Sequence, residues 1–356
     1  NLVITGKAIT LHATGSLDVL ASSSISSATG DGGSLSLHNV DFLGNIDVGR
    51  GDISLSSDNG ATTRIRSPIS ISGPIRVTAS QDVLIEAAVD QTTTASIIEV
   101  VAGTGNGVDG GVRVISSRLH AVGDISVSGG MFVGPAPDSF GIRVDVGSTI
   151  RSTLGDVTLD TRPLNTLIDS DVQLYGEVSG IAVSLDVGRD VQMGATAILS
   201  AGTGGVLVTT GRDFKMSDGA QVTADAIVSI ATARDLDVAH LRSSSSGLAV
   251  YLASESVMDA GDLDVDILAP TGRIQFNVGS VGSPVDPLEI QVETLSGVVG
   301  PDIVFCETLY ALMICIVLPP FPISFCHAHR PIASEPEAMT LALNFSKVVI
   351  SAPPGR

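Results

Sequence analysis

The sequence contains no tryptophan, and only 3% of its 356 residues are aromatic although 44% are hydrophobic. Compact globular enzymes usually fill their cores with more aromatic side chains, so this composition disfavours that class. Helical periodicity is also nearly absent before residue 300, whereas apolar residues recur at every second position. Aliphatic side chains stacked in a narrow interior, with many of the 39 glycines at corners, would give this profile, so we expect an all-β chain.

Positive charge is scarce as well. Nineteen Lys and Arg residues stand against 38 Asp and Glu residues, which gives a formal net charge of −19 and an isoelectric point near 4.4. A surface of this potential repels nucleic acid and anionic lipid, so neither is expected as a partner. The acidity is typical of a well-solvated extracellular surface.

Cysteine does not occur in the first 305 residues, and the three cysteines that follow are Cys306, Cys315 and Cys326. This usage is typical of a secreted bacterial surface protein and allows one disulfide with a spare thiol near the C-terminus. Which pair closes stays open, and His327 and His329 beside Cys326 match no strong metal-ligand spacing. The chain opens directly in strand-like alternation with no signal peptide, so we expect a processed or partial product.

No long uninterrupted apolar run occurs. The most apolar stretch, 303–326, is interrupted by Glu307 and by Pro319, Pro320 and Pro322 before about 20 apolar residues accumulate. We therefore expect no membrane span.

The clearest positive signal is a repeat between Gly180 and Gly297. Five apolar pairs lie 25, 22, 22 and 24 residues apart: Ile181/Val183, Val206/Val208, Val228/Ile230, Val250/Leu252 and Ile274/Phe276. A second set keeps the same interval: Val191/Met193, Phe214/Met216 and Leu236/Val238. Two short strands in each unit of about 22 residues are typical of one rung of a parallel β-helix. We predict such a β-solenoid, of ten or more rungs, over 1–300.

The segment 301–356 differs from the repeats and forms a second expected region. It is rich in apolar residues and proline, and both ends of a solenoid expose strand edges that need cover. The segment therefore either caps its own rod or docks on a second copy, head to tail, to build a filament. Within it, 335–344 forms either a short capped helix or a strand. The expected docking residues are Phe305, Tyr310, Leu312, Ile314, Ile316, Phe321 and Phe325.

Several stretches resemble the repeats of filamentous-haemagglutinin-like exoproteins. They are Gly-Asp-Ile-Ser-Leu at 51–55, Gly-Asp-Ile-Ser-Val at 123–127, Gly-Asp-Val-Thr-Leu at 155–159, and 277–292, where Pro287-Leu-Glu-Ile-Gln-Val follows Val-Gly-Ser. The resemblance covers about 1–303. It implies a right-handed parallel β-helix exported by a Gram-negative bacterium, often by two-partner secretion, that acts in adhesion, biofilm or cell contact. The family's N-terminal secretion domain has no counterpart here, and 304–356 matches none of its repeats.

Two short motifs are weak binding candidates. Arg50-Gly51-Asp52 is a tripeptide that adhesins present to receptors, although Gly-Asp before a strand is also this chain's ordinary corner. Asp262, Asp264 and Asp266 would share one face of a strand and form a weak calcium candidate, or else a plain acidic outward row. No other cofactor is expected.

Arg-Asp recurs at the rung interval, as Arg189-Asp190, Arg212-Asp213 and Arg234-Asp235. Parallel β-helices include polysaccharide lyases and hydrolases that use such carboxylates, but a repeated pair is more typical of a structural ladder than of a single active site. We therefore expect no enzyme.

The sequence thus predicts a secreted, structural or adhesive surface protein that assembles end to end into a filament. The alternative is a passive stalk that meets a host receptor or glycan through loops at 90–111, 129–140 and 161–171, and an enzyme acting on polysaccharide stands third.

Overall fold

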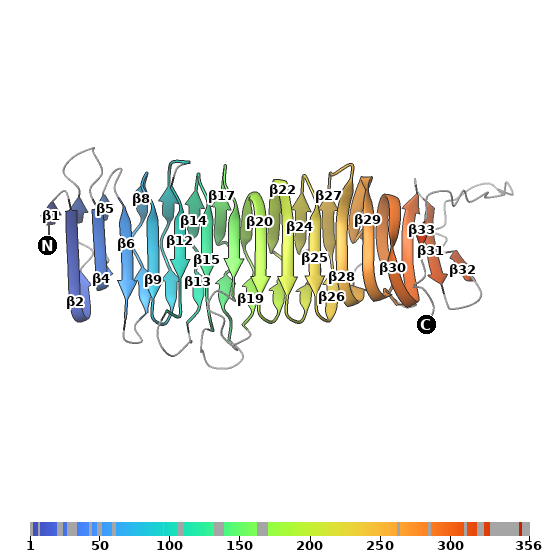
Figure 1. The fold of residues 1–356 in the computed structure, drawn as a ribbon, viewed down its shortest axis with the longest axis horizontal. Coiled ribbons are helices and arrows are strands. Elements are labelled where there is room, and N and C mark those ends of the chain that lie inside the picture. Colours follow the sequence, from blue (N-terminus) through green and yellow to red (C-terminus); the bar gives the residue numbers. More distant parts are fainter. Residues whose placement is uncertain are drawn as a thin grey trace.

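The computed structural model is a rod built from strands (Figure 1). It describes residues 3–5, 8–19, 24–26, 34–42, 45–47, 52–58, 62–94, 96–104, 110–131, 139–161, 170–261, 264–283, 286–309, 312–318, 324–327 and 349–350. None of these residues is helical, and the strands stack in parallel over about ten turns, as in a right-handed parallel β-helix. The predicted fold is confirmed.

Each complete turn contributes to three parallel ladders of strands, whereas the repeat predicted two strands in each unit. The first ladder contains β7 (Thr63–Ile65), β10 (Val83–Ile85), β13 (Val112–Val114), β16 (Ile142–Val144), β19 (Val172–Leu174), β21 (Val191–Met193), β23 (Phe214–Met216) and β26 (Asp235–Val238). The second contains β1 (Val3–Thr5), β3 (Ser24–Ser26), β5 (Asn45–Asp47), β8 (Ile69–Ile71), β11 (Val89–Gln91), β14 (Arg118–Ala121), β17 (Thr149–Ser152), β24 (Gln221–Ala224) and β27 (His240–Ser243).

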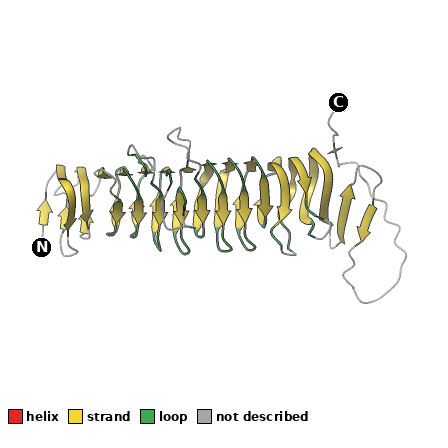
Figure 2. Ribbon diagram, turned by 90° about the horizontal axis from the view of Figure 1, so that it is seen from below, coloured by secondary structure: helices red, strands yellow, loops and turns green. Residues whose placement is uncertain are grey.

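The third ladder contains β2 (Ala8–Val19), β4 (Ser34–Phe42), β6 (Ile53–Ser57), β9 (Ile75–Ala79), β12 (Ile98–Val101), β15 (Ile125–Ser128), β18 (Val157–Asp160) and β25 (Val228–Thr232). Five longer strands run through a corner and so belong to more than one ladder: β20 (Glu177–Val187), β22 (Ile198–Thr210), β28 (Leu248–Asp259), β29 (Ile267–Val281) and β30 (Leu288–Leu309). Figure 2 shows the strands stacked along the rod from the N-terminal to the C-terminal end.

Alternation along each strand builds the core. In β9, for example, Ile75, Val77 and Ala79 are fully buried while Arg76 between them is exposed. Because parallel strands stack in register, the inward residue of one turn lies on the inward residue of the next. The second ladder shows this as one column of fully buried aliphatic residues: Val89, Leu119, Ile150, Val178, Leu199, Val222, Leu241, Ile267 and Ile290.

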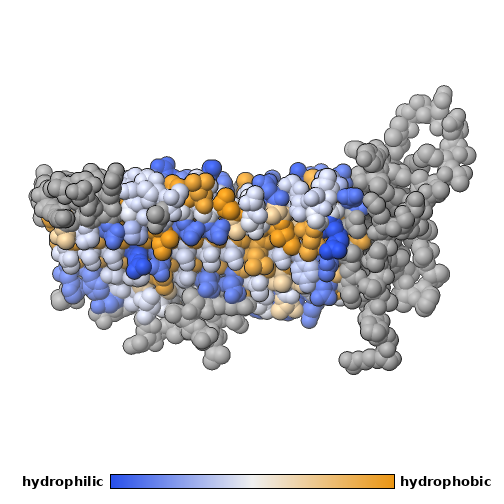
Figure 3. All heavy atoms as spheres, turned by 45° about the horizontal axis from the view of Figure 1, so that its top comes forward, coloured by the Kyte–Doolittle hydropathy of each residue, from blue (hydrophilic) through white to orange (hydrophobic). Residues whose placement is uncertain are grey.

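The outward residues are mostly small or polar. In the face drawn in Figure 3, hydrophilic residues predominate, and hydrophobic residues appear among them over the middle of the rod. Leu207 in β22 is one of the exposed aliphatic residues, with 51% of its surface accessible.

The register of the predicted pairs is confirmed from Val206 onward and wrong before it. Val206 stacks on Val228, and Val228 on Val250, as the spacing predicted. The residue before them in the stack is Val183, not Ile181, because the register shifts between Gly180 and Ala182. The interval between the residues that stack, Val183 and Val206, is therefore 23 residues rather than the 25 counted from Ile181.

The C-terminal strands depart from the parallel stack. β31 (Leu312–Leu318) pairs antiparallel with 303–309 of β30, and β32 (Ser324–His327) pairs antiparallel with β31. β33 (Val349–Ile350) pairs in parallel with Ser296 and Gly297 of β30. β30 runs across the boundary expected at residue 300, and the segment beyond it continues the sheet as an antiparallel meander.

Candidate functional site

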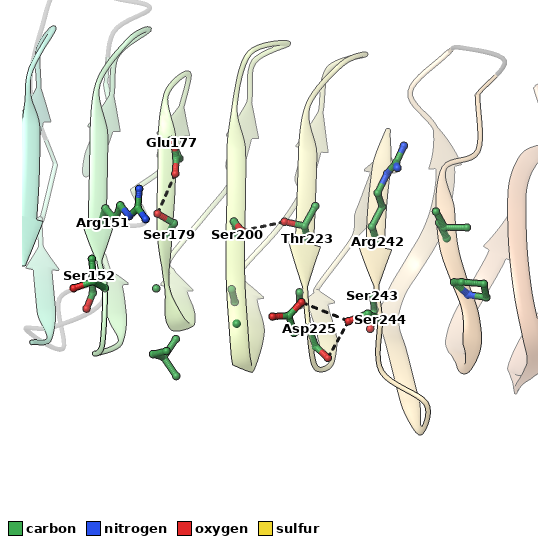
Figure 4. Close-up of a pocket in the computed structure, with 18 residues that line it drawn as sticks. Arg151, Ser152, Glu177, Ser179, Ser200, Thr223, Asp225, Arg242, Ser243 and Ser244 are labelled. Atoms are coloured by element: carbon green, nitrogen blue, oxygen red, sulfur yellow. Dashed lines mark hydrogen bonds between the residues drawn. The ribbon is translucent and has the colours of Figure 1, made fainter. Parts of the chain in front are cut away.

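A groove of about 610 Å³ lies along the second ladder. Its floor is a single row of outward side chains, one from each of five successive turns (Figure 4). The register places each member of the row beside the next: Arg151, Ser179, Ser200, Thr223 and Arg242. The groove therefore runs along the rod axis rather than around it.

Small residues create the hollow. At the bend between the second and third ladders, Ala201 stacks on Ala224, and Ala224 on Ser243, so no large side chain fills this corner. Gly180 and Gly202 line the same wall.

Hydroxyls that line the groove form hydrogen bonds with their neighbours. Thr223 Oγ1 donates to Ser200 Oγ over 3.1 Å, and Ser179 Oγ donates to Glu177 Oε1 over 3.1 Å. Ser244 Oγ, on the lower wall, donates to the carbonyl of Asp225 over 3.3 Å. These contacts fix the side-chain directions, and each hydroxyl oxygen keeps capacity to accept a hydrogen bond from a ligand.

An arginine closes the row at each end. Arg151 and Arg242 are both exposed, and neither forms an ion pair with a carboxylate in the described part of the chain. They lie four turns apart, which is about 19 Å at the ordinary spacing of strands. The groove thus offers an extended ligand hydroxyl groups along its middle and a positive charge at either end.

A second arrangement, which we call the Arg-Asp ladder, lies on the first ladder. Each arginine reaches back one turn: Arg189 pairs with Asp171, Arg212 Nη2 lies 3.0 Å from Asp190 Oδ2, and Arg234 Nη2 lies 2.7 Å from Asp213 Oδ2. The three aspartates are buried at their corners. The predicted repeat of charges is therefore a continuous ladder, but its acidic members are interior residues.

Backbone amides also donate hydrogen bonds to aspartates of this ladder. The amide of Asp190 donates to Asp171 Oδ1 over 3.1 Å, and the amide of Asp213 donates to Asp190 Oδ1 over 3.1 Å. Burial raises the pKa of Asp213, but hydrogen bonds from the Arg234 side chain and the Asp235 amide outweigh it, so the net shift is downward. The pKa of Asp190 is raised, chiefly by burial. The carboxylates of Asp171, Asp190 and Asp213 are thus engaged in joining one turn to the next.

A smaller hollow of about 460 Å³ borders this ladder. The Arg143 guanidinium lies over the Tyr175 ring there, 5.1 Å from its centroid. Arg143 also pairs with Asp145 over 2.7 Å, and Arg113 pairs with the same carboxylate over 2.8 Å.

The structure describes the two weak binding motifs only in part. Of the Arg50-Gly51-Asp52 tripeptide, Arg50 and Gly51 lie outside the described residues, and Asp52 is exposed directly before β6. Of the acidic trio, Asp262 lies outside the described residues, Asp264 is exposed, and Asp266 is completely buried. Asp264 and Asp266 therefore do not form one outward acidic row, because the chain bends here before β29 begins.

The expected binding loops are shorter than predicted. The segment 90–111 contains β12, whose Ile98 and Val100 are fully buried, so most of it is a rung rather than a protrusion. In 129–140, Phe140 is buried, and in 161–171, Thr161 and Asp171 are buried. The parts at 105–109, 132–138 and 162–169 lie outside the described residues.

In the C-terminal segment the structure describes strands but not the expected docking side chains. Phe305 lies in β30, Leu312, Ile314 and Ile316 in β31, and Phe325 in β32. Tyr310, Phe321 and the stretch 335–344 lie outside the described residues. The register sets Cys315 opposite Cys306 on one side and opposite Cys326 on the other. Directly opposed antiparallel residues have a backbone separation that a disulfide can bridge, so both pairings stay open.

None of the described residues belongs to a helix with the length and apolar character needed to span a membrane. No family model, curated protein or solved structure gives a significant match to this chain.

Proposed function

We propose that this chain is a structural and adhesive rod displayed on a bacterial surface, and that the groove on its second ladder binds an extended polysaccharide. The observation that carries the proposal is the row from Arg151 to Arg242, in which three hydroxyl side chains from consecutive turns lie between two exposed arginines. Binding residues usually lie in loops that a rigid scaffold positions. Here, in contrast, the strands of the second ladder form the proposed binding surface.

The geometry suits a linear ligand. The row repeats at the strand spacing of about 4.8 Å, which is close to the length of one sugar unit in an extended chain. Hydroxyls can exchange hydrogen bonds with sugar hydroxyls, and each arginine can hold a carboxylate or sulfate group. A polysaccharide that carries acidic groups about four units apart would satisfy both ends of the row. The absence of aromatic side chains among the groove-lining residues favours binding through hydrogen bonds rather than stacking.

Export and surface display rest on the sequence. Acidity, the confinement of cysteine to the C-terminal region, and the resemblance to filamentous-haemagglutinin-like repeats all support an extracellular location. A long rod of stacked turns is a suitable spacer for a binding surface held away from a cell.

The proposal is tested by screening the full chain against an array of neutral and acidic polysaccharides. The double variant Arg151→Gln/Arg242→Gln removes both terminal charges without disturbing buried residues. A charged hydrogen bond contributes about 1.5–3 kcal/mol, so we expect the double variant to bind an acidic polysaccharide at least tenfold more weakly. Arg76→Gln is the matched control, because Arg76 is 64% exposed on the third ladder and pairs with Glu99 outside the groove. Equal loss in the control and the double variant would contradict a role for the groove.

A second function, assembly end to end, is favoured by the antiparallel meander. β32 pairs only with β31 among the described strands, and we propose that a strand from another copy pairs with its other edge. We expect the full chain to form fibres in negative-stain electron microscopy and a version ending at Gly300 to give single rods. Single rods from the full chain, with clumping of the truncated one, would instead make the C-terminal strands a cap on their own rod.

A further inference from the structure

Three buried carboxylates meet near the C-terminal end of the described rod, and neither the groove nor the Arg-Asp ladder includes them. Asp259 ends β28, Asp266 directly precedes β29, and Glu289 is the second residue of β30. One oxygen atom from each lies within 4.8 Å of the other two. The three residues are 8%, 0% and 4% exposed, so they lie together in a part of the corner that water hardly reaches.

The backbone holds two of these residues on successive turns. The amide of Asp266 donates to the carbonyl of Glu289 over 2.9 Å, and the amide of Glu289 donates to Asp266 Oδ2 over 2.7 Å. The amide of Gly261 donates to Asp259 Oδ1 over 3.0 Å. These contacts leave Asp266 Oδ1 and Asp259 Oδ2 buried with no hydrogen-bond partner in the described structure. Two orphaned acceptors thus lie in the same small cluster.

Asp259 and Asp266 differ from the other buried aspartates that the structure describes. The other aspartates that are buried among the described residues, Asp171, Asp190 and Asp213, each pair with an arginine. No described Lys, Arg or His pairs with Asp259 or Asp266. Burying the charges of Asp259 and Asp266 without a counter-charge is costly, so these two carboxyls must gain either protons or a cation.

From this geometry we infer that Asp259, Asp266 and Glu289 form a binding site for one Ca²⁺ ion, which joins the last two complete turns of the rod. Carboxylate oxygens are the ligands that Ca²⁺ prefers, and they coordinate it at about 2.3–2.6 Å. Two ligands of such an ion can lie up to roughly 4.6–5.2 Å apart, and the three oxygens, all within 4.8 Å of one another, meet that limit. Mg²⁺ dehydrates reluctantly and is seldom held by a dedicated set of protein carboxylates alone, which favours Ca²⁺ at this buried site.

Burial, together with the carboxylates of Asp259 and Glu289, raises the pKa of Asp266 to about 10. Burial and the neighbouring Asp286 also raise the pKa of Asp259. A cation held between them would reverse this effect and keep all three carboxylates ionised at neutral pH.

The site includes one residue of the acidic trio that the sequence suggested, Asp266, but takes its other two members from elsewhere. Asp259 and Glu289 come from the strands before and after, because stacking of turns, not spacing along the strand, brings the oxygens together. Asp264, two residues away, is exposed and belongs to no such group among the described residues.

Isothermal titration of the full chain with CaCl₂, after removal of metal by a chelator, tests the inference. We expect one site in the wild type, at least tenfold weaker binding in Asp266→Asn, and unchanged binding in the control Asp264→Asn. Each substitution removes one charge from the same region, so a general effect of the chain's acidity would affect both variants equally. Unchanged binding in Asp266→Asn, loss in Asp264→Asn, or tighter binding of Mg²⁺ than of Ca²⁺ would overturn the assignment.

Thermal unfolding followed by circular dichroism provides a second readout that does not depend on heat of binding. CaCl₂ should raise the melting temperature of the wild type relative to EDTA, and it should leave that of Asp266→Asn unchanged. If Asp266→Asn does not fold, Glu289→Gln takes its place in both measurements. A wild type with the same melting temperature in CaCl₂ and EDTA would show that the carboxyls share protons instead, and the inference would be wrong.

Discussion

Replacing Leu252 by alanine tests the stacked core most sharply, because the chain provides the same substitution on the outside of the same ladder. Leu252 is fully buried in β28, where it stacks between Ile230 and Phe276. Leu207 in β22 points outward from the third ladder and is 51% exposed. Leu252→Ala and Leu207→Ala therefore remove the same three carbon atoms from opposite faces of one sheet.

The expected magnitudes differ several-fold. Three buried carbon atoms correspond to about 2.4 kcal/mol of lost transfer free energy at about 0.8 kcal/mol each. A cavity term adds to this, because the turns above and below are held at the strand spacing and cannot collapse into the space. We expect Leu252→Ala to lower the free energy of unfolding by about 3–4 kcal/mol. Leu207→Ala should lower it by less than about 1 kcal/mol, since half of that side chain is in water already.

Equilibrium unfolding in urea, followed by circular dichroism, measures both variants. Repeat proteins can unfold in more than one step, so the first transition and its slope should be compared as well as the midpoint. A loss below about 1 kcal/mol for Leu252→Ala, or equal losses for the two variants, would refute the inward and outward assignment of this ladder.

Further predictions concern the corners and the charges. Gly205 has a positive φ of 80°, and a Cβ there would lie 2.5 Å from the carbonyl oxygen of Ile227, whereas Gly147, with φ 75°, has open space. Gly147→Ala should cost about 1–2 kcal/mol from backbone strain alone, and Gly205→Ala should cost more in the same urea assay. Because the pKa of Asp213 is lowered in the folded protein, its carboxylate stabilises the fold fully above its ordinary value of 3.8, and this contribution is lost as pH falls through the folded pKa. The difference in unfolding free energy between wild type and Asp213→Asn, measured from pH 7 downward, should therefore be constant at first and shrink below about pH 3.8; an unchanged difference at pH 2 would contradict this.

The alternation of apolar residues was enough to predict the fold and two of the three ladders. Val206, Val228 and Val250 mark the third ladder, and Val191 and Phe214 mark the first, each in the register that the structure shows. The second ladder was missed because strands such as β22 run through the corner and join it to the third ladder, so the repeat was divided into two strands instead of three. Gly202, Gly204 and Gly205 lie inside β22 rather than at its end, so these glycines do not separate the strand around Leu199 from the residues that follow.

The groove and the carboxylate cluster could not be predicted from the sequence, for a related reason. Arg151 and Arg242 belong to one row only because of the register of the second ladder. Nothing in the sequence around either arginine indicates this. The carboxylates of Asp259, Asp266 and Glu289 come together from three different strands and bends. The Arg-Asp ladder, in contrast, could be predicted because the same dipeptide recurs at the rung interval, although its burial could not.

Obstruction of the groove tests the proposed polysaccharide site most directly. Ser200→Tyr places a bulky ring in the middle of the row, whereas Ser126→Tyr makes the same change at an outward position of the third ladder. With the acidic polysaccharide that binds best on the array, we expect Ser200→Tyr to abolish binding and Ser126→Tyr to bind like the wild type. Wild-type binding by Ser200→Tyr, in a variant whose circular dichroism and melting temperature match those of the wild type, would contradict the groove as the binding site.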